Sequence, residues 1–278
     1  MNSIKKMMLS GALGCLISGM AYADGSSPQP VKPYWQDIQV VAVNKEKPRS
    51  SFMSYADRET ALTSRFEKSP YYSLLNGTWK FFFVDSYKDL PQNITDPSVN
   101  TSSWDDITVP GNWEVQGHGV AIYTNHGYEF KPRNPQPPLL PEANPVGVYR
   151  RDIEIPASWD NRDIYLHIGG AKSGLYVYLN GKEVGYSEDS KNPAEFLINK
   201  YLQPGKNVLT LKIFRWSTGS YLECQDFWRM SGIERDVFLW SQPKASIQDF
   251  RVVSTLDDTY TNGIFKLCLL YTSDAADE

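Results

Sequence analysis

The chain has 278 residues, of which 41% are hydrophobic, 22% are charged and eight are tryptophan. This composition is that of a globular protein that can bury a core, and it excludes an intrinsically disordered chain. The formal net charge of −4 provides no basic surface for a nucleic acid or an anionic membrane, so we expect neither as a partner.

Residues 1–23 have the pattern of a bacterial secretory signal peptide. Lys5 and Lys6 precede an apolar run over residues 7–20, which ends in Ala21-Tyr22-Ala23, a typical cleavage site. The run is too short to span a bilayer, which takes about 20 apolar residues. We therefore expect the protein to be exported to the periplasm or secreted.

A polar, proline-rich segment at residues 24–34 predicts a linker. Cys15 lies inside the predicted signal peptide, and a lipid-modified start at this cysteine is the alternative to cleavage after Ala23. Cys268 lies near the C-terminus, so Cys224 is the only cysteine of the predicted domain that follows the linker. We expect no internal disulfide there, and we expect Cys224 to be a packed thiol because no histidine lies near it in sequence.

From residue 35 to residue 243 the pattern is almost entirely that of β-strands. Asp57 predicts the N-cap of one short helix ending by Phe66. Asn180-Gly181 predicts a tight hairpin turn, because both residues tolerate positive φ. His167 falls on the solvent face of its predicted strand and is not expected to bind a metal. The runs typical of strands are 78–84, 147–155, 163–168, 175–179, 182–187, 207–216, 237–240 and 250–254. They predict an antiparallel β-sandwich or jelly roll.

Six prolines between Tyr128 and Gly147 exclude this segment from a sheet. We expect a long ordered loop lying over the sandwich, with disorder as the alternative.

The stretch from residue 215 to residue 240 interleaves hydrogen-bonding groups with aromatic rings: Tyr221, Glu223, Gln225, Asp226, Phe227 and Trp228. Such a mixture suits a neutral sugar, because carboxylates accept hydroxyl hydrogen bonds and rings cover the apolar C–H face. The alternative is that the rings belong to the core and the acids are merely solvated.

Three long motifs resemble the N-terminal sugar-binding domain of the large bacterial β-galactosidases of glycoside hydrolase family 2. They are VPGNWEVQGHGVAIYTN (109–125), YLNGKEVGYSEDS (178–190) and RWSTGSYLECQDFWRMSGIERDV (215–237). The resemblance extends over roughly residues 35–250. Cys224 departs from it, standing where relatives often carry an acid, and so does His118.

The resemblance implies an all-β chain: a galactose-binding-like jelly roll at 35–243, then the incomplete start of an immunoglobulin-like β-sandwich at 244–267. It also implies a (β/α)8 barrel that carries two catalytic glutamates and a magnesium ion. Because the chain lacks alternating β and α patterns, we assign no catalytic residue to it and expect it to be inactive alone. A full-length homo-oligomer is compatible with the family.

The resemblance further implies that Asn112 and Asp226 contact a β-galactoside substrate, and that Asp226 also ligates a sodium ion. Read without the resemblance, Asn112 is a turn or cap residue after Pro110-Gly111. Two other functions remain open, a non-catalytic carbohydrate-binding module and a related activity such as β-glucuronidase.

The last segment, residues 268–278 (CLLYTSDAADE), is a poor continuation of a strand. It matches the translation of a DNA-library adapter, and we expect it to be of that origin. A genuine variable segment is the alternative.

Overall fold

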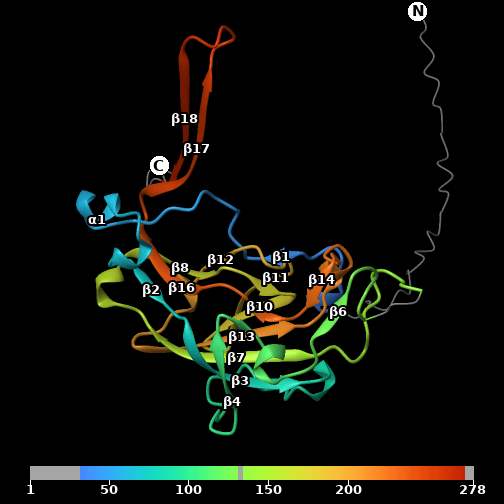
Figure 1. Cartoon of the computed structure of the whole chain (residues 1–278). Coiled ribbons are helices and arrows are strands. Elements are labelled where there is room, and N and C mark those ends of the chain that lie inside the picture. Colours follow the sequence, from blue (N-terminus) through green and yellow to red (C-terminus); the bar gives the residue numbers. More distant parts are fainter. Residues whose placement is uncertain (1–31, 131–133, 273–278) are drawn as a thin grey trace, which may run out of the picture. The chain divides into compact units, whose positions relative to one another are not determined.

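The computed structural model describes residues 32–130 and 134–272 (Figure 1). The predicted signal peptide, most of the predicted linker and residues 273–278 lie outside this range. Two antiparallel sheets pack face to face around one core, which confirms the predicted all-β sandwich. Within the described residues, no helix is long and apolar enough to cross a membrane.

The described residues form a larger sheet of seven strands and a smaller sheet of four. The larger has the order β1 (Ala42–Val43), β11 (Lys182–Ser187), β10 (Gly174–Leu179), β13 (Lys206–Phe214), β7 (Val146–Glu154), β3 (Gly77–Val84) and β4 (Asp105–Val109). The smaller has the order β12 (Ala194–Leu197), β8 (Arg162–Ile168), β16 (Val237–Pro243) and β2 (Tyr72–Leu74). The predicted strands are thus confirmed, with ends shifted by a few residues.

Local signals placed the turns and the helix correctly. Asn180 and Gly181 have φ values of 53° and 78° and join β10 to β11, so the predicted hairpin turn is confirmed. Helix α1 (Arg58–Leu62) is capped by Asp57, whose side chain accepts from Thr60 N at 2.8 Å, although the helix ends before Phe66. Short 3-10 helices are η1 (Tyr34–Gln36), η2 (Phe66–Lys68), η3 (Tyr87–Asp89), η4 (Glu114–Gln116), η5 (Ala157–Trp159), η6 (Asn199–Tyr201) and η7 (Thr218–Tyr221).

The core lies between the two sheets, where alternate residues of each strand point inward. Phe81 of β3 and Tyr149 of β7 are neighbours in register, with ring centroids 4.7 Å apart. Leu211 of β13 extends the same layer, and Leu166 and Leu239 contribute from the smaller sheet. All five side chains are fully buried, so this cluster is the main source of hydrophobic stabilisation.

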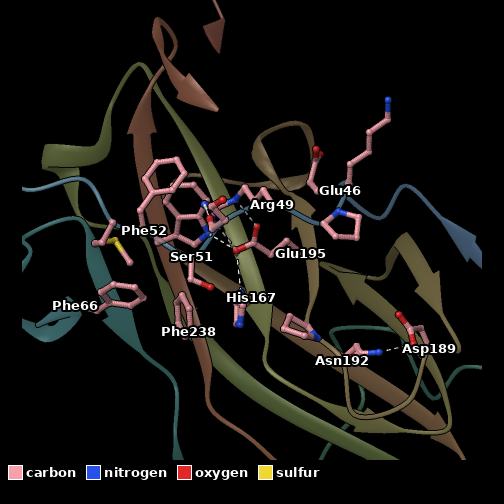
Figure 2. Close-up of a pocket in the computed structure, with 16 residues that line it drawn as sticks. Glu46, Arg49, Ser51, Phe52, Phe66, His167, Asp189, Asn192, Glu195 and Phe238 are labelled. Carbon is pink, nitrogen blue, oxygen red and sulfur yellow. Dashed lines mark hydrogen bonds and ion pairs between the residues drawn. The ribbon is translucent and has the colours of Figure 1, made fainter. Parts of the chain in front are cut away.

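The outer faces of both sheets are also covered, and this corrects the prediction for His167. The segment 46–53 crosses the outer face of the smaller sheet (Figure 2). His167 Nδ1 lies 2.8 Å from Glu195 Oε1, and its ring stacks on Phe238 at 4.2 Å. The side chain is only 19% exposed, so the predicted solvent-facing position is wrong. Strand alternation identifies the outer face but not what covers it.

Residues 246–272 form a two-stranded antiparallel ribbon of β17 (Ser246–Leu256) and β18 (Gly263–Thr272). Cys268 to Thr272 continue β18, so the prediction that this segment would not extend a strand is wrong. Leu269, Leu270, Tyr271 and Thr272 include β-branched and aromatic residues, which the pleated backbone accommodates well.

Candidate functional site

Two small sheets at the ends of the main strands hold the segments that carry Asn112 and Asp226. One contains β5 (Gly111–Asn112), β15 (Gly232–Ile233) and β9 (Ala171–Lys172) in the order β5-β15-β9. The other pairs β6 (Ile122–Thr124) with β14 (Phe227–Arg229). Two of the three motifs singled out in the sequence, 109–125 and 215–237, therefore meet through backbone pairing.

Asn112 is half-buried and lies opposite Gly232 in register. Its Nδ2 donates to Ser231 O at 3.3 Å and to Glu234 Oε1 at 3.2 Å. Gly232 has a φ of 121°, and a Cβ there would lie 2.8 Å from Gly111 O, so only glycine permits this close pairing. The site around Asn112 thus depends on the glycine opposite it.

Asp226 is exposed, and its Oδ1 accepts a hydrogen bond from Tyr123 Oη at 2.7 Å. This bond raises the pKa of Tyr123. Tyr123 and Trp228 face each other in register with ring centroids 5.7 Å apart, and their side chains are 55% and 54% exposed. A carboxylate beside two exposed rings is the combination that sugar recognition uses.

A series of contacts links the surroundings of Asn112 to the segment carrying Asp226. Glu234, which accepts from Asn112, also forms an ion pair with Lys191 Nζ at 2.6 Å. Lys191 Nζ in turn lies 5.3 Å from the centroid of the Phe227 ring, next in sequence to Asp226. The two predicted residues thus belong to connected parts of one structure, although their side chains are not hydrogen-bonded to each other.

The other residues singled out in the 215–240 stretch make contacts within the protein. The partly buried Tyr221 ring packs edge-on against Tyr128 and Phe130 of the proline-rich segment. Glu223 Oε1 accepts from Ser190 N at 2.9 Å. Cys224 Sγ lies 3.1 Å from Ser220 O, and burial raises the pKa of the thiol, in agreement with the prediction of a packed cysteine.

A buried cluster of opposite charges lies behind the site, and sequence reasoning missed it. Arg229 Nε is 3.3 Å from Glu129 Oε2, and Arg215 Nε is 3.9 Å from Glu129 Oε1. Arg215 Nη1 is also 3.7 Å from Glu114 Oε1. All four side chains are at most 5% exposed. In the sequence, these four charged residues are notable only because each has an aromatic residue close by.

This charged cluster holds the site segments together. Ser231 N donates to Glu114 Oε2 at 2.8 Å, which joins the chain after Asn112 to the chain before Gly232. Burial raises the pKa of Glu114, and the hydrogen bond from Ser231 opposes that shift. Arg215 Nη2 donates to Val120 O at 2.9 Å, and so fixes the chain that leads into β6.

The proline-rich segment is ordered in its described parts, as predicted. Trp216 Nε1 donates to Glu129 Oε1 at 2.7 Å, and Phe130 packs against the Trp216 ring at 5.5 Å. The hydroxyl of Tyr221 donates to Leu139 O. These contacts place the segment over the loop that precedes Asp226.

A cavity of about 330 Å³ lies under the 46–53 segment, away from these residues (Figure 2). Its central carboxylate, Glu195, already accepts hydrogen bonds from Arg49, His167 and Trp240. Glu195 is therefore already occupied by its protein donors and has little capacity left for a ligand.

Any metal ion bound by the described residues would have to use isolated side chains as ligands. No group of three or more His, Cys, Asp or Glu in residues 32–130 and 134–272 is arranged to hold a metal ion. Asp226 uses Oδ1 for Tyr123, and Oδ2 accepts no hydrogen bond from these residues. Hard cations take oxygen ligands, so Asp226 fits as one ligand of such an ion.

Comparison with known proteins identifies relatives of this arrangement. Residues 72–243 match the family model described as "Glycosyl hydrolases family 2, sugar binding domain". The β-galactosidase of Priestia megaterium is 41% identical over 234 residues, which are 83% of this chain and 23% of that protein. The β-galactosidase of Psychromonas ingrahamii is 38% identical over 229 residues, or 82% of this chain and 22% of that protein. The chain thus spans less than a quarter of these relatives.

Solved structures with the same fold are more distant in sequence. A β-glycosidase from Bacteroides vulgatus has a TM-score of 0.54 and 22% identity, covering 73% of this chain and 24% of that chain. A β-glucuronidase from an uncultured Clostridium has a TM-score of 0.53 and 20% identity, covering 73% of this chain and 34% of that chain. At these identities the likeness concerns the fold alone.

Proposed function

Because the chain belongs to glycosyl hydrolases family 2, whose sugar binding domain it carries, we propose that it supplies one wall of the substrate pocket of a β-galactosidase. The substrate is a terminal, non-reducing β-D-galactose residue. Asn112 and Asp226 are the residues that contact it. The relatives named β-galactosidase support this choice of sugar.

The observation that carries the proposal is the surface formed by Tyr123, Asp226 and Trp228. The carboxylate is held by Tyr123 at 2.7 Å and keeps Oδ2 for a sugar hydroxyl, while the exposed rings cover C–H groups. In a retaining glycosidase, two further carboxyl groups about 5–5.5 Å apart perform the chemistry. We assign that pair to a barrel domain of the whole enzyme, together with its magnesium ion.

Asp226 is also proposed as a ligand of a sodium ion. The ion would bring positive charge beside the sugar, and a carboxylate can bridge a hard cation and a hydroxyl. The signal-like residues 1–23 support export, so the enzyme would act in the periplasm or the medium on galactosides taken from outside.

Chemical-shift mapping of the ¹⁵N-labelled chain with methyl β-D-galactopyranoside tests the proposal. We expect weak binding, with shifts in Tyr123, Asp226 and Trp228, that Asp226→Ala removes and sodium strengthens. Asp258→Ala, which changes an exposed aspartate in the β17–β18 turn, is the matched control. Shifts that Asp226→Ala leaves unchanged would overturn the assignment of Asp226.

Two further measurements separate the alternatives. The chain should not hydrolyse a chromogenic galactoside, and hydrolysis that disappears in Asp226→Ala would contradict the assignment of chemistry to another domain. Methyl β-D-glucuronide should cause smaller shifts than the galactoside, since Asp226 repels a carboxylate. A reversed preference would favour β-glucuronidase.

A further inference from the structure

A hollow of about 490 Å³ lies beside Asp226 and has no assigned role. Gln225 and Phe227, the two neighbours of Asp226, form part of its wall. Lys172 and Lys191 line it from the other side. Its volume is within the range of small-molecule sites, about 300–1,000 Å³.

The ammonium group of Lys172 has no partner in the described part of the chain. The residue is 4% exposed, and its Nζ lies 5.4 Å from the centroid of the Phe227 ring. Its backbone pairs with that of Gly232, but its Nζ makes neither a hydrogen bond nor an ion pair with residues 32–130 or 134–272. Burial of the side chain lowers the pKa of Lys172. An unpaired buried charge is unfavourable to the fold, so it calls for a compensating partner.

Two further polar atoms of the wall are buried without a partner. They are Ser190 Oγ and Glu223 Oε2. The hollow therefore offers a charged donor, a hydroxyl that both donates and accepts, and a carboxylate oxygen that only accepts. Native proteins leave few such atoms unsatisfied, and ligands or water commonly complete them.

The positive and negative side chains that line the hollow are equal in number, and this indicates an uncharged ligand. Lys191 is neutralised by Glu234 at 2.6 Å, and Asp189 pairs with Lys45 at 3.4 Å. Lys172 and Glu223 remain, one of each sign. An anion would be repelled by Glu223 and a cation by Lys172. A neutral molecule with adjacent hydroxyl groups satisfies both, because one hydroxyl donates to Glu223 and another accepts from Lys172.

We propose that this hollow is a subsite for one neutral sugar unit, bound by Lys172, Ser190 and Glu223. The inference rests on the proposed function, since it extends the saccharide site past Asp226. It differs in one respect. The three residues assigned to it all belong to this chain, so this chain is used to test it.

Chemical-shift mapping with up to 100 mM methyl β-D-galactopyranoside tests the subsite. We expect shifts at Ser190, Glu223 and Gln225, and an apparent affinity about tenfold lower in Lys172→Met. The same variant should unfold at a higher temperature, because it removes an unpaired buried charge. Ser190→Ala removes only one hydroxyl group of the hollow and should lower the galactoside affinity severalfold. This smaller change tests whether the loss of affinity in Lys172→Met arises in the hollow.

Lys212→Met is the matched control. Lys212 is also desolvated, with a pKa lowered to about 8, and its Nζ lies 4.7 Å from the centroid of the Tyr176 ring. It does not line the hollow. This variant should leave the shifts at Ser190 and Gln225 unchanged. If it abolished them as Lys172→Met does, the effect would be global and the subsite would be refuted.

The remaining outcomes separate the subsite from the proposed function. Shifts around Tyr123 and Trp228 that depend on Asp226, without shifts at Ser190 and Glu223, overturn the subsite and leave the proposed function standing. Shifts at Ser190 that Lys172→Met removes, without dependence on Asp226, support the subsite and count against the role of Asp226. Binding of methyl galacturonoside but not of the neutral galactoside would overturn the neutral assignment.

Discussion

The hydroxyl of Tyr123 holds the carboxylate of Asp226 with a 2.7 Å hydrogen bond, although the two residues are 103 positions apart in sequence. The bond fixes the acid on an exposed surface, where a free aspartate would sample several rotamers. Ordering the acid before a ligand arrives reduces the entropy lost on binding. Tyr123 is therefore a positioning residue for the proposed sugar contact.

We predict that Tyr123→Phe weakens galactoside binding severalfold while leaving the free energy of unfolding almost unchanged, because the lost bond is exposed to water. Titration followed by chemical shifts gives the first value and urea unfolding the second. The ring stays in place, so the change isolates the hydroxyl. Tyr260→Phe, at an exposed tyrosine of the β17–β18 turn, should alter neither. Unchanged affinity in Tyr123→Phe would show that Asp226 needs no positioning.

Glu129 is the buried carboxylate between Arg215 and Arg229, and it also accepts from Trp216 at 2.7 Å. We predict that Glu129→Gln lowers the free energy of unfolding by about 3–5 kcal/mol, since it leaves two buried guanidinium groups without their shared charge. Urea unfolding measures the loss. Glu142→Gln, on the same proline-rich segment, removes an exposed ion pair with Lys88 and should leave the stability almost unchanged. Equal losses would refute the central role of Glu129.

Sequence reasoning predicted those features of the fold that depend on neighbours in the chain. The Asn180-Gly181 turn and the Asp57 cap follow from residues at fixed short offsets, and both are confirmed. His167 was placed wrongly because its environment is set by Glu195 and by a segment more than 100 residues earlier.

In the candidate site, too, sequence reasoning found single residues but not their distant partners. Asp226 was selected from its motif, but its partner Tyr123 comes from a different motif and no local pattern couples the two. The pairing of Glu114 with Arg215 likewise joins segments about 100 residues apart. Whether Lys172 has a partner depends on the residues that surround it in the fold, and sequence spacing does not reveal these residues.

Gly185 of β11 lies where the edge strand β1 and the core approach most closely. A Cβ at this position would be 2.3 Å from Val43 O and 2.7 Å from the Phe196 ring. We predict that Gly185→Ala costs about 1–3 kcal/mol of unfolding free energy, because the backbone of β1 must move. Gly263→Ala is the control, since no atom lies within 4 Å of its Cβ position. Thermal unfolding compares the two, and a stable Gly185→Ala protein would show that β1 is loosely held.

Glu195 anchors the 46–53 segment to the smaller sheet (Figure 2). Its Oε1 accepts from Arg49 Nη2 at 3.1 Å, from Trp240 Nε1 at 3.0 Å and from the Nδ1 of His167 at 2.8 Å. Burial alone would raise the pKa of Glu195, but the hydrogen bond from His167 and the charge of Arg49 outweigh it, and the pKa is lowered from its ordinary value of 4.5.

Because the folded pKa of Glu195 is depressed, its stabilisation is present above pH 4.5 and is lost as the pH falls through the folded value. We predict that Glu195→Gln is less stable than the unchanged protein by about 2–3 kcal/mol at pH 7, since Arg49 loses its partly buried partner. The difference should shrink as the pH falls from the ordinary carboxyl pKa through the lower folded pKa, where Glu195 of the folded protein becomes protonated. Denaturant unfolding at several pH values measures it, with the exposed Glu154→Gln as control. Parallel stability curves for Glu195→Gln and the unchanged protein would show that the carboxylate charge does not hold the segment.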